Sequence, residues 1–235
     1  MFRNTGVMLH YCSCNSCGHI WTACLDDWTD RDFQERIYND DYVLADPPFT
    51  HDRPARNSAM IGDMVGEFRP GLTILDWGGG GGLMARMLRG LGFQNIVSYD
   101  PFYGDNPLTP GKTFDLVTCF EVIEHVPDQR ALFADLARHV AADGALLFST
   151  LLQPADIGEL RLGWWYARPR NGHIRLHSPE SLELCLSREG LRLKSLSDEM
   201  HVAYRDPDSA LVEALLAAEV HAPSQPPARS LADYS

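Results

Sequence analysis

The sequence lacks any long apolar run. No stretch of its 235 residues approaches the roughly 20 consecutive apolar residues that a membrane-spanning helix needs. Residues 1–6 also lack the charged region and following apolar stretch of a secretory signal. We therefore expect a cytoplasmic protein without a membrane segment.

Positive charge is scarce as well. The 20 lysines and arginines stand against 32 aspartates and glutamates, which gives a formal net charge of -12. Such a chain has no general electrostatic attraction to nucleic acid phosphates or to anionic membranes. We expect neither among its partners. The length suits one domain with additions and is enough for a sizeable core.

Cysteines are few in the body of the chain but crowded at its start. Four of the six lie within the first 24 residues, namely Cys12, Cys14, Cys17 and Cys24. In a reducing compartment such a cluster indicates metal binding, or a relict of it, rather than disulfides. Cys14 and Cys17 have the spacing with which two thiolates can bind one tetrahedral zinc ion. A structural zinc site and an unmetallated segment are both open.

Strand patterns alternate with helix patterns from residue 58 onward. The predicted strands are 72–76, 95–99, 114–120, 145–149, 191–196 and 201–204. The predicted helices are 58–68, 83–91, 128–142, 178–190 and 208–220. This alternation predicts an α/β fold, a doubly wound Rossmann-like sheet with helices on both faces.

Three parts of the chain differ in composition. Residues 1–50 predict a small, irregular, cysteine-containing cap, and Pro47–Pro48 marks its end. The core is predicted over 51–205. Residues 206–235 predict a C-terminal helix and a tail rich in proline, serine and alanine, a composition typical of mobile segments.

Five glycines, residues 78–82, lie between a predicted strand and a predicted helix. Glycine allows positive backbone angles and lets a ligand approach the main chain closely. Asp100 ends the next strand, where a carboxylate can accept hydrogen bonds from ribose hydroxyls. Ligands of open parallel sheets bind beyond the carboxyl ends of the strands. The loop and Asp100 therefore predict a nucleoside site, with a flexible turn and a capping aspartate as the plainer explanations.

The glycine spacing fits a dinucleotide site poorly. A G-x-G-x-x-G motif from Gly78 would end at Leu83, and the looser form from Gly80 to Ala85 starts late relative to the strand. No P-loop lysine follows, which disfavours nucleoside triphosphate hydrolysis. The run instead fits Asp-x-Gly-x-Gly-x-Gly and resembles the first motif of class I S-adenosylmethionine-dependent methyltransferases. The positions that fit are Asp76, Gly78, Gly80 and Gly82.

Three later segments strengthen this resemblance. Residues 114–128 are similar to the fourth-strand motif of the same family, and residues 144–150 are similar to its fifth strand. Residues 172–178 resemble a later segment of a subgroup that acts on small molecules and sugars. The resemblance covers about residues 58–205.

The resemblance implies roles at the matching positions. The backbone at Gly78 and Gly80 would pass the methionine moiety of S-adenosylmethionine. Asp76 would anchor the loop and, through water, the amino group, while Asp100 would hold the ribose. Four further positions would complete the cofactor site: Gly82 in the loop, Phe102 against adenine, and Phe120 and Glu121 at its border.

The sequence departs from the family in two places. Only thirteen residues separate Asp100 from Phe114, where the family fits a helix and a third strand, so the sheet edge is expected to be reduced. Asp105 is a candidate to replace the acid that often binds the adenine amino group there, but the sequence does not assign it that role. The subgroup also carries two cysteine pairs before its core, and only the second is matched here. Tyr38 and Tyr42 resemble its tyrosine-rich stretch and are candidates for capping the cofactor or for core packing.

Methyl transfer from a sulfonium is an in-line displacement that depends mainly on alignment of the acceptor with the methyl group. A hydroxyl acceptor also needs a base, and histidine titrates in the right range. The catalytic candidates are Glu124, His125 and His173, each of which could instead be a cap or a solvated loop residue. Trp164, Trp165 and Tyr166 could wall an acceptor pocket or pack beneath the loop.

These observations predict a methyltransferase that transfers a methyl group from S-adenosylmethionine to a small-molecule acceptor. A sugar or a natural-product intermediate, methylated on oxygen or carbon, is the expected class. A nicotinamide-dependent oxidoreductase is the first alternative, disfavoured by the glycine register. A binding module that kept the fold without catalysis is the second, favoured by the shortened segment after Asp100 and the missing cysteine pair.

Overall fold

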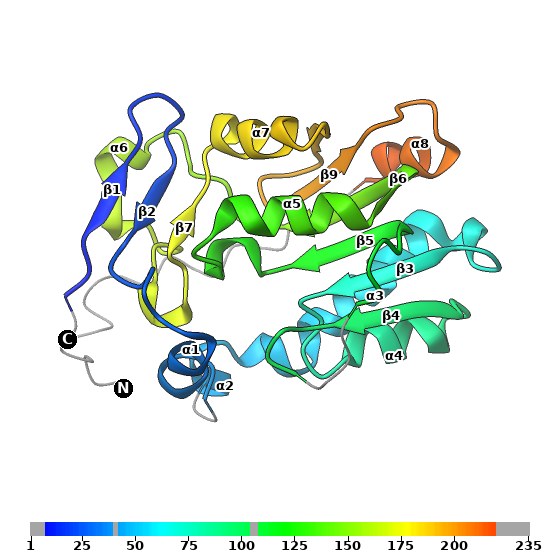
Figure 1. The fold of residues 1–235 in the computed structure, drawn as a ribbon, viewed down its shortest axis with the longest axis horizontal. Helices are drawn as coiled ribbons and strands as arrows, with labels where there is room; N and C mark the ends of the chain where they lie inside the picture. The colour runs from blue at the N-terminus through cyan, green and yellow to red at the C-terminus, as the bar shows by residue number, and fades with distance from the viewer. Residues whose placement is uncertain (1–7, 40–41, 104–107, 220–235) are drawn as a thin grey trace.

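The computed structural model describes residues 8–39, 42–103 and 108–219. Its larger sheet has six strands in the order β4-β3-β5-β6-β9-β8 (Figure 1). The bounds are β3 (Thr73–Trp77), β4 (Asn95–Tyr99), β5 (Phe114–Phe120), β6 (Val140–Ser149), β8 (Arg192–Ser195) and β9 (Met200–Tyr204). The first four are parallel, and β9 and β8 continue the sheet antiparallel. The predicted α/β fold is confirmed.

Helices cover both faces of this sheet. One face packs against α3 (Asp52–Val65), α4 (Leu83–Gly90) and α8 (Ala210–Ala217). The other packs against α5 (Gln129–His139) and α7 (Pro179–Arg188). Successive strand residues point to opposite faces, so in β5 Leu116 joins the α3 side and Val117 joins the α5 side. This two-sided burial explains the near-continuous apolar runs of the strands.

Two of the helices that cover the large sheet begin with side-chain caps. Asp128 accepts a hydrogen bond from the amide of Ala131 at the start of α5. Ser178 and Ser181 form a reciprocal capping box at the start of α7, with Pro179 at the first helical position. Such a cap stabilises a helix by about 1 kcal/mol. The predicted start of α7 is confirmed.

The boundary between α5 and β6 differs from the prediction. The helix predicted over 128–142 ends at His139, and β6 begins at Val140. Val140 is buried, has extended backbone angles and pairs with Phe114. Tertiary strand pairing therefore prevails over the helical spacing of the apolar residues.

A second, antiparallel sheet joins the start of the chain to a late loop. It consists of β1 (Tyr11–Ser13), β2 (Ile20–Thr22) and β7 (Arg175–Leu176). The first fifty residues, predicted to be irregular, therefore contribute two strands. In Figure 1 this sheet, in blue and yellow, lies beyond the carboxyl end of β5. It packs against α6 (Ile157–Leu160), and Ile174, just before β7, packs against α1 (Asp30–Arg36) and α2 (Tyr42–Ala45).

Arg175 ties the small sheet to the core. Its buried guanidinium donates to the carbonyls of Thr22 and Pro127 and to the carboxylate of Asp26. These bonds join three distant chain segments, and they position the residues just before β7 at the end of β5.

Asp105 and the tail from 220 lie outside the described residues. None of the described helices is long and apolar enough to cross a membrane.

Candidate functional site

The glycine loop connects β3 to α4 at the carboxyl edge of the large sheet. The amides of Gly78 and Gly79 donate to the carbonyl of Tyr99, at 2.7 and 3.1 Å, and tie the loop to the end of β4. Gly78, Gly80 and Gly82 have φ angles of +76°, +53° and +71°. Side chains strain such a left-handed backbone. The loop therefore requires the glycines that the motif supplies.

Gly78 also makes the closest approach to the end of β5. A Cβ atom at this position would lie 2.4 Å from Cγ2 of Val122, far inside van der Waals contact. The missing side chain lets the loop lie directly against Val122, which precedes the turn that bears Glu124 and His125. The predicted cofactor and acceptor sides are consequently in contact.

Asp100 caps the loop from the end of β4. Its Oδ2 accepts a hydrogen bond from the amide of Gly80 at 2.9 Å, and its Oδ1 accepts one from Phe102 at 2.8 Å. Burial raises the pKa of this carboxyl, and the two amide donors oppose that rise. Each carboxylate oxygen has a further lone pair. Asp100 can hold the loop and accept ribose hydroxyls together, and its ribose role stays a prediction.

Asp76 lies beneath the loop and is only 3% exposed. Its carboxylate accepts hydrogen bonds from the hydroxyls of Thr118 and Ser98, at 3.2 and 3.3 Å. A Cβ on Gly79 would lie 2.3 Å from Asp76 Oδ2. Burial raises the pKa of Asp76 to about 6. These contacts support the loop from below, which is the anchoring position implied for this residue.

Phe102 and Phe120 belong to different apolar clusters. Phe102 packs beside Tyr38, with ring centroids 5.8 Å apart. This pair belongs to a cluster with Leu9, Leu25, Trp28, Phe33, Ile37, Tyr42 and Ile174. Phe120 packs against the apolar cluster on the α3 side of the sheet. Their predicted roles at the cofactor stay predictions, as does the capping role of Tyr38.

Glu121 has strained backbone geometry at the end of β5. Its φ angle is +54°, which is uncommon for a residue with a side chain and often marks a functional position. Its amide donates to the Ser149 hydroxyl at 2.9 Å, and that hydroxyl donates back to Oε1 at 2.8 Å. Its Oε2 lies 3.7 Å from Nη2 of Arg53.

Arg53 is a site residue that sequence reasoning missed. It lies in α3 and forms a two-bond ion pair with Asp46, at 2.8 and 3.1 Å, besides facing Glu121. Residues 51–57 read only as a polar segment, with no spacing that pointed to β5. The packing of α3 against the sheet places the guanidinium of Arg53 beside Glu121, at the end of β5.

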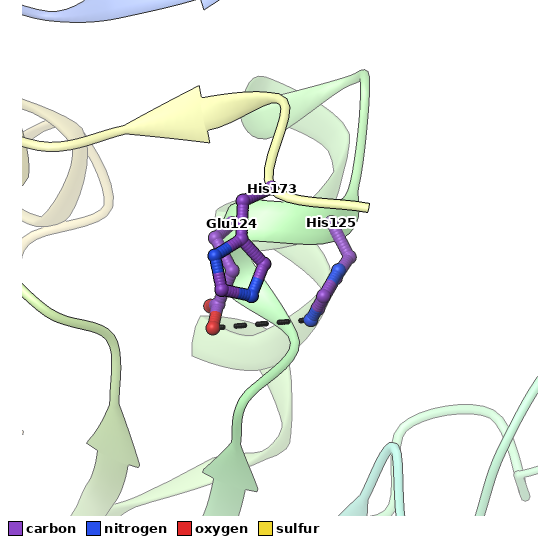
Figure 2. Close-up of side chains that lie close together, drawn as sticks. All are labelled: Glu124, His125 and His173. Carbon is purple, nitrogen blue, oxygen red and sulfur yellow. Dashed lines mark ion pairs between the residues drawn. The ribbon is translucent and has the colours of Figure 1, made fainter. Parts of the chain in front are cut away.

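The three catalytic candidates meet in one cluster, which Figure 2 shows. Glu124 and His125 lie on a 3-10 turn, Ile123–His125, after β5, and His173 comes from the loop before β7. The imidazole rings have centroids 5.0 Å apart. Glu124 Oε1 lies 3.9 Å from Nε2 of His125. The sequence placed these residues in two separate motifs, and the fold brings them together.

Tyr166 orients two members of this cluster. Its hydroxyl donates to Glu124 Oε1 at 2.5 Å, and its carbonyl lies 2.8 Å from Nδ1 of His173. The rings of Tyr166 and His173 are in tilted contact, with centroids 4.1 Å apart. Tyr166 therefore packs inside the cluster, whereas the sequence suggested only a pocket wall or packing beneath a loop.

Burial sets the protonation of this cluster. Burial lowers the pKa of His125 to about 4 and also lowers that of His173. Burial and the nearby Glu121 raise the pKa of Glu124 to about 7. Both imidazoles are consequently neutral at physiological pH. A neutral imidazole can accept a proton or donate its lone pair to a metal ion.

His177 lies outside the cluster and is fully buried. Its Nδ1 lies 3.0 Å from the hydroxyl oxygen of Ser181, and its Nε2 lies 2.9 Å from the side-chain oxygen of Gln129. Because both nitrogens are already paired, this histidine is part of the packing between α5 and α7.

The cysteine pair does not assemble the expected zinc ligands. Cys14 and Cys17 lie at the turn between β1 and β2, both partly exposed. His19, which follows this turn, stacks on Trp21 with centroids 5.9 Å apart. Among the described residues, the cysteine, histidine and acidic side chains that gather closely enough to share an ion are Glu124, His125 and His173. A site of four ligands around Cys14 and Cys17 is therefore unsupported.

Comparison with known protein families shows which family this chain belongs to. Residues 49–196, which contain the glycine loop and the cluster, match a family described as a methyltransferase domain. The chain belongs to this methyltransferase family. The resemblance predicted from the loop at 76–82 and the segments that follow is confirmed.

Curated relatives of this methyltransferase include ubiquinone biosynthesis O-methyltransferases. That of Rickettsia canadensis (strain McKiel) is 28% identical over 155 residues, covering 53% of this chain and 64% of the relative. That of Parvibaculum lavamentivorans is 30% identical over 175 residues, covering 60% of this chain and 68% of the relative. The methyltransferase thus spans somewhat less than two thirds of the Rickettsia protein's length.

Solved structures share the fold at low sequence identity. An O-methyltransferase family protein from Burkholderia thailandensis superimposes with a TM-score of 0.53 at 16% identity, covering 72% of this chain and 61% of that one. DesVI from Streptomyces venezuelae superimposes with a TM-score of 0.51 at 16% identity, covering 71% of this chain and 98% of that one. These likenesses agree with the Rossmann-like sheet.

Proposed function

We propose that this methyltransferase transfers the methyl group of S-adenosylmethionine to a hydroxyl oxygen of a small-molecule acceptor. The observation that carries the proposal is the contact between Gly78 and Val122, where a Cβ would meet a methyl group at 2.4 Å. That contact sets the glycine loop beside the turn that bears Glu124 and His125. A nucleoside-binding loop and a proton-accepting cluster then share one edge of the sheet.

Two features support a hydroxyl acceptor. Neutral imidazoles next to the expected methyl position can take a proton from an acceptor hydroxyl. The relatives from Rickettsia and Parvibaculum are also named O-methyltransferases. The aromatic rings around the cluster, which include Tyr38 and Tyr166, favour an apolar or flat acceptor.

Calorimetry with three nucleosides tests the proposal. We expect S-adenosylmethionine and S-adenosylhomocysteine to bind with one molecule per chain, and NAD to bind far more weakly, because the loop fits the dinucleotide motif poorly. Comparable or tighter binding of NAD would favour the oxidoreductase. Methyl transfer from labelled S-adenosylmethionine to a panel of hydroxylated small molecules then separates the enzyme from a binding module.

A further inference from the structure

The spacing of Glu124, His125 and His173 suits a shared cation. One nitrogen or oxygen from each side chain lies within 4.8 Å of the others. Figure 2 shows the three side chains converging from the turn after β5 and from the loop before β7. A metal ion holds such atoms at about 2 Å from itself. Small side-chain movements are therefore enough to bring all three onto one ion.

Glu124 supplies an independent sign of a missing partner. The residue is fully buried, and its Oε2 has no hydrogen-bond partner, whereas Oε1 accepts from Tyr166. Buried carboxylate oxygens are normally satisfied, because an unpaired one is costly outside water. A cation held by both carboxylate oxygens would satisfy Oε2, and Oε1 already lies 3.9 Å from Nε2 of His125.

Tyr166 holds Glu124 and His173 in place, as residues around a metal site hold its ligands. Its carbonyl lies at hydrogen-bond distance from Nδ1 of His173, so the proton belongs on that nitrogen and the lone pair on Nε2. Its hydroxyl fixes the carboxylate of Glu124 through the bond to Oε1. Metal-binding histidines and carboxylates are typically held in this way.

We propose that Glu124, His125 and His173 bind one divalent first-row transition-metal ion. Two imidazoles and a carboxylate are the ligands that such ions favour, whereas Mg²⁺ and Ca²⁺ favour oxygen ligands. Glu121 is not part of the ligand set, since its carboxylate faces Ser149 and Arg53. It contributes negative charge beside the ion.

The ion would deepen the proposed function, and this role rests on it. Three protein ligands leave coordination positions open for an acceptor hydroxyl. Coordination lowers the pKa of that hydroxyl. Because the bound ion occupies the imidazole lone pairs, the hydroxyl proton then leaves to solvent and not to a histidine. The oxyanion then forms a C–O bond to the methyl carbon as the C–S bond breaks. The electron pair of that bond stays on sulfur, which becomes the neutral thioether of S-adenosylhomocysteine.

Cobalt titration of the full chain tests the ion site without any acceptor. We expect metal-free protein to bind one Co²⁺ per chain, with visible ligand-field bands and a raised melting temperature. Zn²⁺ should displace Co²⁺ and remove the bands, since it binds comparable sites more tightly. Displacement by a comparable concentration of Mg²⁺ would overturn the assignment to a transition metal.

Variants locate the bound ion. Glu124→Gln and His173→Ala should each weaken Co²⁺ binding at least ~10-fold, the lower end of what even an outer-sphere substitution costs. His201→Gln is the matched control, because His201 is a buried histidine whose nitrogens already contact Ser195 and Thr150. Unchanged binding in both cluster variants, or no binding to the parent chain, overturns the proposal. If one variant fails to fold, Co²⁺ binding by the other variant and the Co²⁺-dependent shift in the parent's melting temperature test the proposal.

Calorimetry on the same samples separates the two proposals. Binding of S-adenosylhomocysteine without binding of Co²⁺ would overturn the ion site and leave the methyltransferase proposal intact. Binding of Co²⁺ without binding of S-adenosylhomocysteine would support the ion site and contradict the proposed cofactor.

Discussion

The two halves of the proposed site, one for the cofactor and one for the acceptor, are built differently. The cofactor half, residues 75–102, has partners for its acids: Asp76 accepts from Thr118 and Ser98, and Asp100 accepts from two backbone amides. The acceptor half, residues 121–125 and 166–175, keeps Oε2 of Glu124 buried and unpaired. The first half thus pairs its buried acids within the protein, whereas the second leaves one buried carboxylate oxygen without a partner among the described residues.

The halves also differ in how far apart their residues lie in the sequence. The cofactor half is one continuous strand, loop, helix and strand. The acceptor half brings Glu124 to Tyr166 across 42 residues, and it needs the small sheet to hold the loop before β7. Substitutions in the first half should therefore affect nucleoside affinity, and those in the second should affect turnover.

The largest expected effect is on turnover in the acceptor half. His173→Ala should lower the rate of methyl transfer by ~10²–10⁴, the usual cost of losing help with removal of the acceptor's proton, whether His173 takes that proton itself or binds the ion that acidifies the hydroxyl. Affinity for S-adenosylhomocysteine should stay nearly unchanged, since the glycine loop is intact. Kinetics with labelled S-adenosylmethionine, together with calorimetry, measure the two quantities.

His177→Ala is the control for His173. Because His177 pairs with Ser181 and Gln129, its loss should lower the melting temperature and leave the rate per folded molecule unchanged. A large loss of S-adenosylhomocysteine binding in folded His173→Ala protein would place this residue in the cofactor half. It would contradict the assignment of nucleoside affinity to one half and turnover to the other.

The next largest effect concerns the buried acid of the cofactor half. The pKa of Asp76 rises from its usual 3.8 to about 6 on folding. The folded state thus binds the proton more tightly, and stability falls as pH rises from 3.8 to about 6. Asp76→Asn should remove this loss and be more stable than the parent by about 3 kcal/mol at neutral pH.

Denaturant titration across pH checks this expectation. The stability gap between parent and Asp76→Asn should close as the pH falls through 6 toward 3.8, where the parent carboxyl becomes protonated in both states. A gap that is constant with pH would mean that Asp76 is ionised equally in the folded and unfolded chains.

Asp100→Ala should have an intermediate effect that is confined to the cofactor half. Losing hydrogen bonds from a charged group to the ribose costs roughly 1.5–3 kcal/mol, or about 10- to 150-fold in affinity for S-adenosylhomocysteine. Calorimetry on folded protein gives the value. Parent-like affinity would remove the ribose assignment of Asp100.

The smallest effect is expected at the cysteines, outside both halves. Cys14→Ser with Cys17→Ser should change the unfolding free energy by no more than about 0.5 kcal/mol, as surface substitutions usually do. Cobalt content should also stay the same, because the proposed ligands are Glu124, His125 and His173. A loss of bound metal in this double variant would place the metal site at Cys14 and Cys17, in the turn between β1 and β2.

Local pattern predicted much of the sheet. The spans of β4 and β5 match the predicted strands at both ends, because their apolar runs are bounded by turn residues and polar positions. The start of β6 was mispredicted, since Val140 continues the helical spacing of α5 while its backbone pairs with Phe114. No local signal separates these alternatives.

The sequence by itself determined the fold class and the cofactor loop. The glycines at 78, 80 and 82 have positive φ angles that their own residue type allows, and Asp76 and Asp100 end neighbouring strands. Each of these properties depends on one residue or on a short stretch. The tertiary structure alone decided that Glu124, His125 and His173 meet, that Tyr166 orients them and that Arg53 faces Glu121. Those contacts join segments whose separation is set by the packing of helices and the pairing of β2 with β7, which no short stretch of sequence encodes.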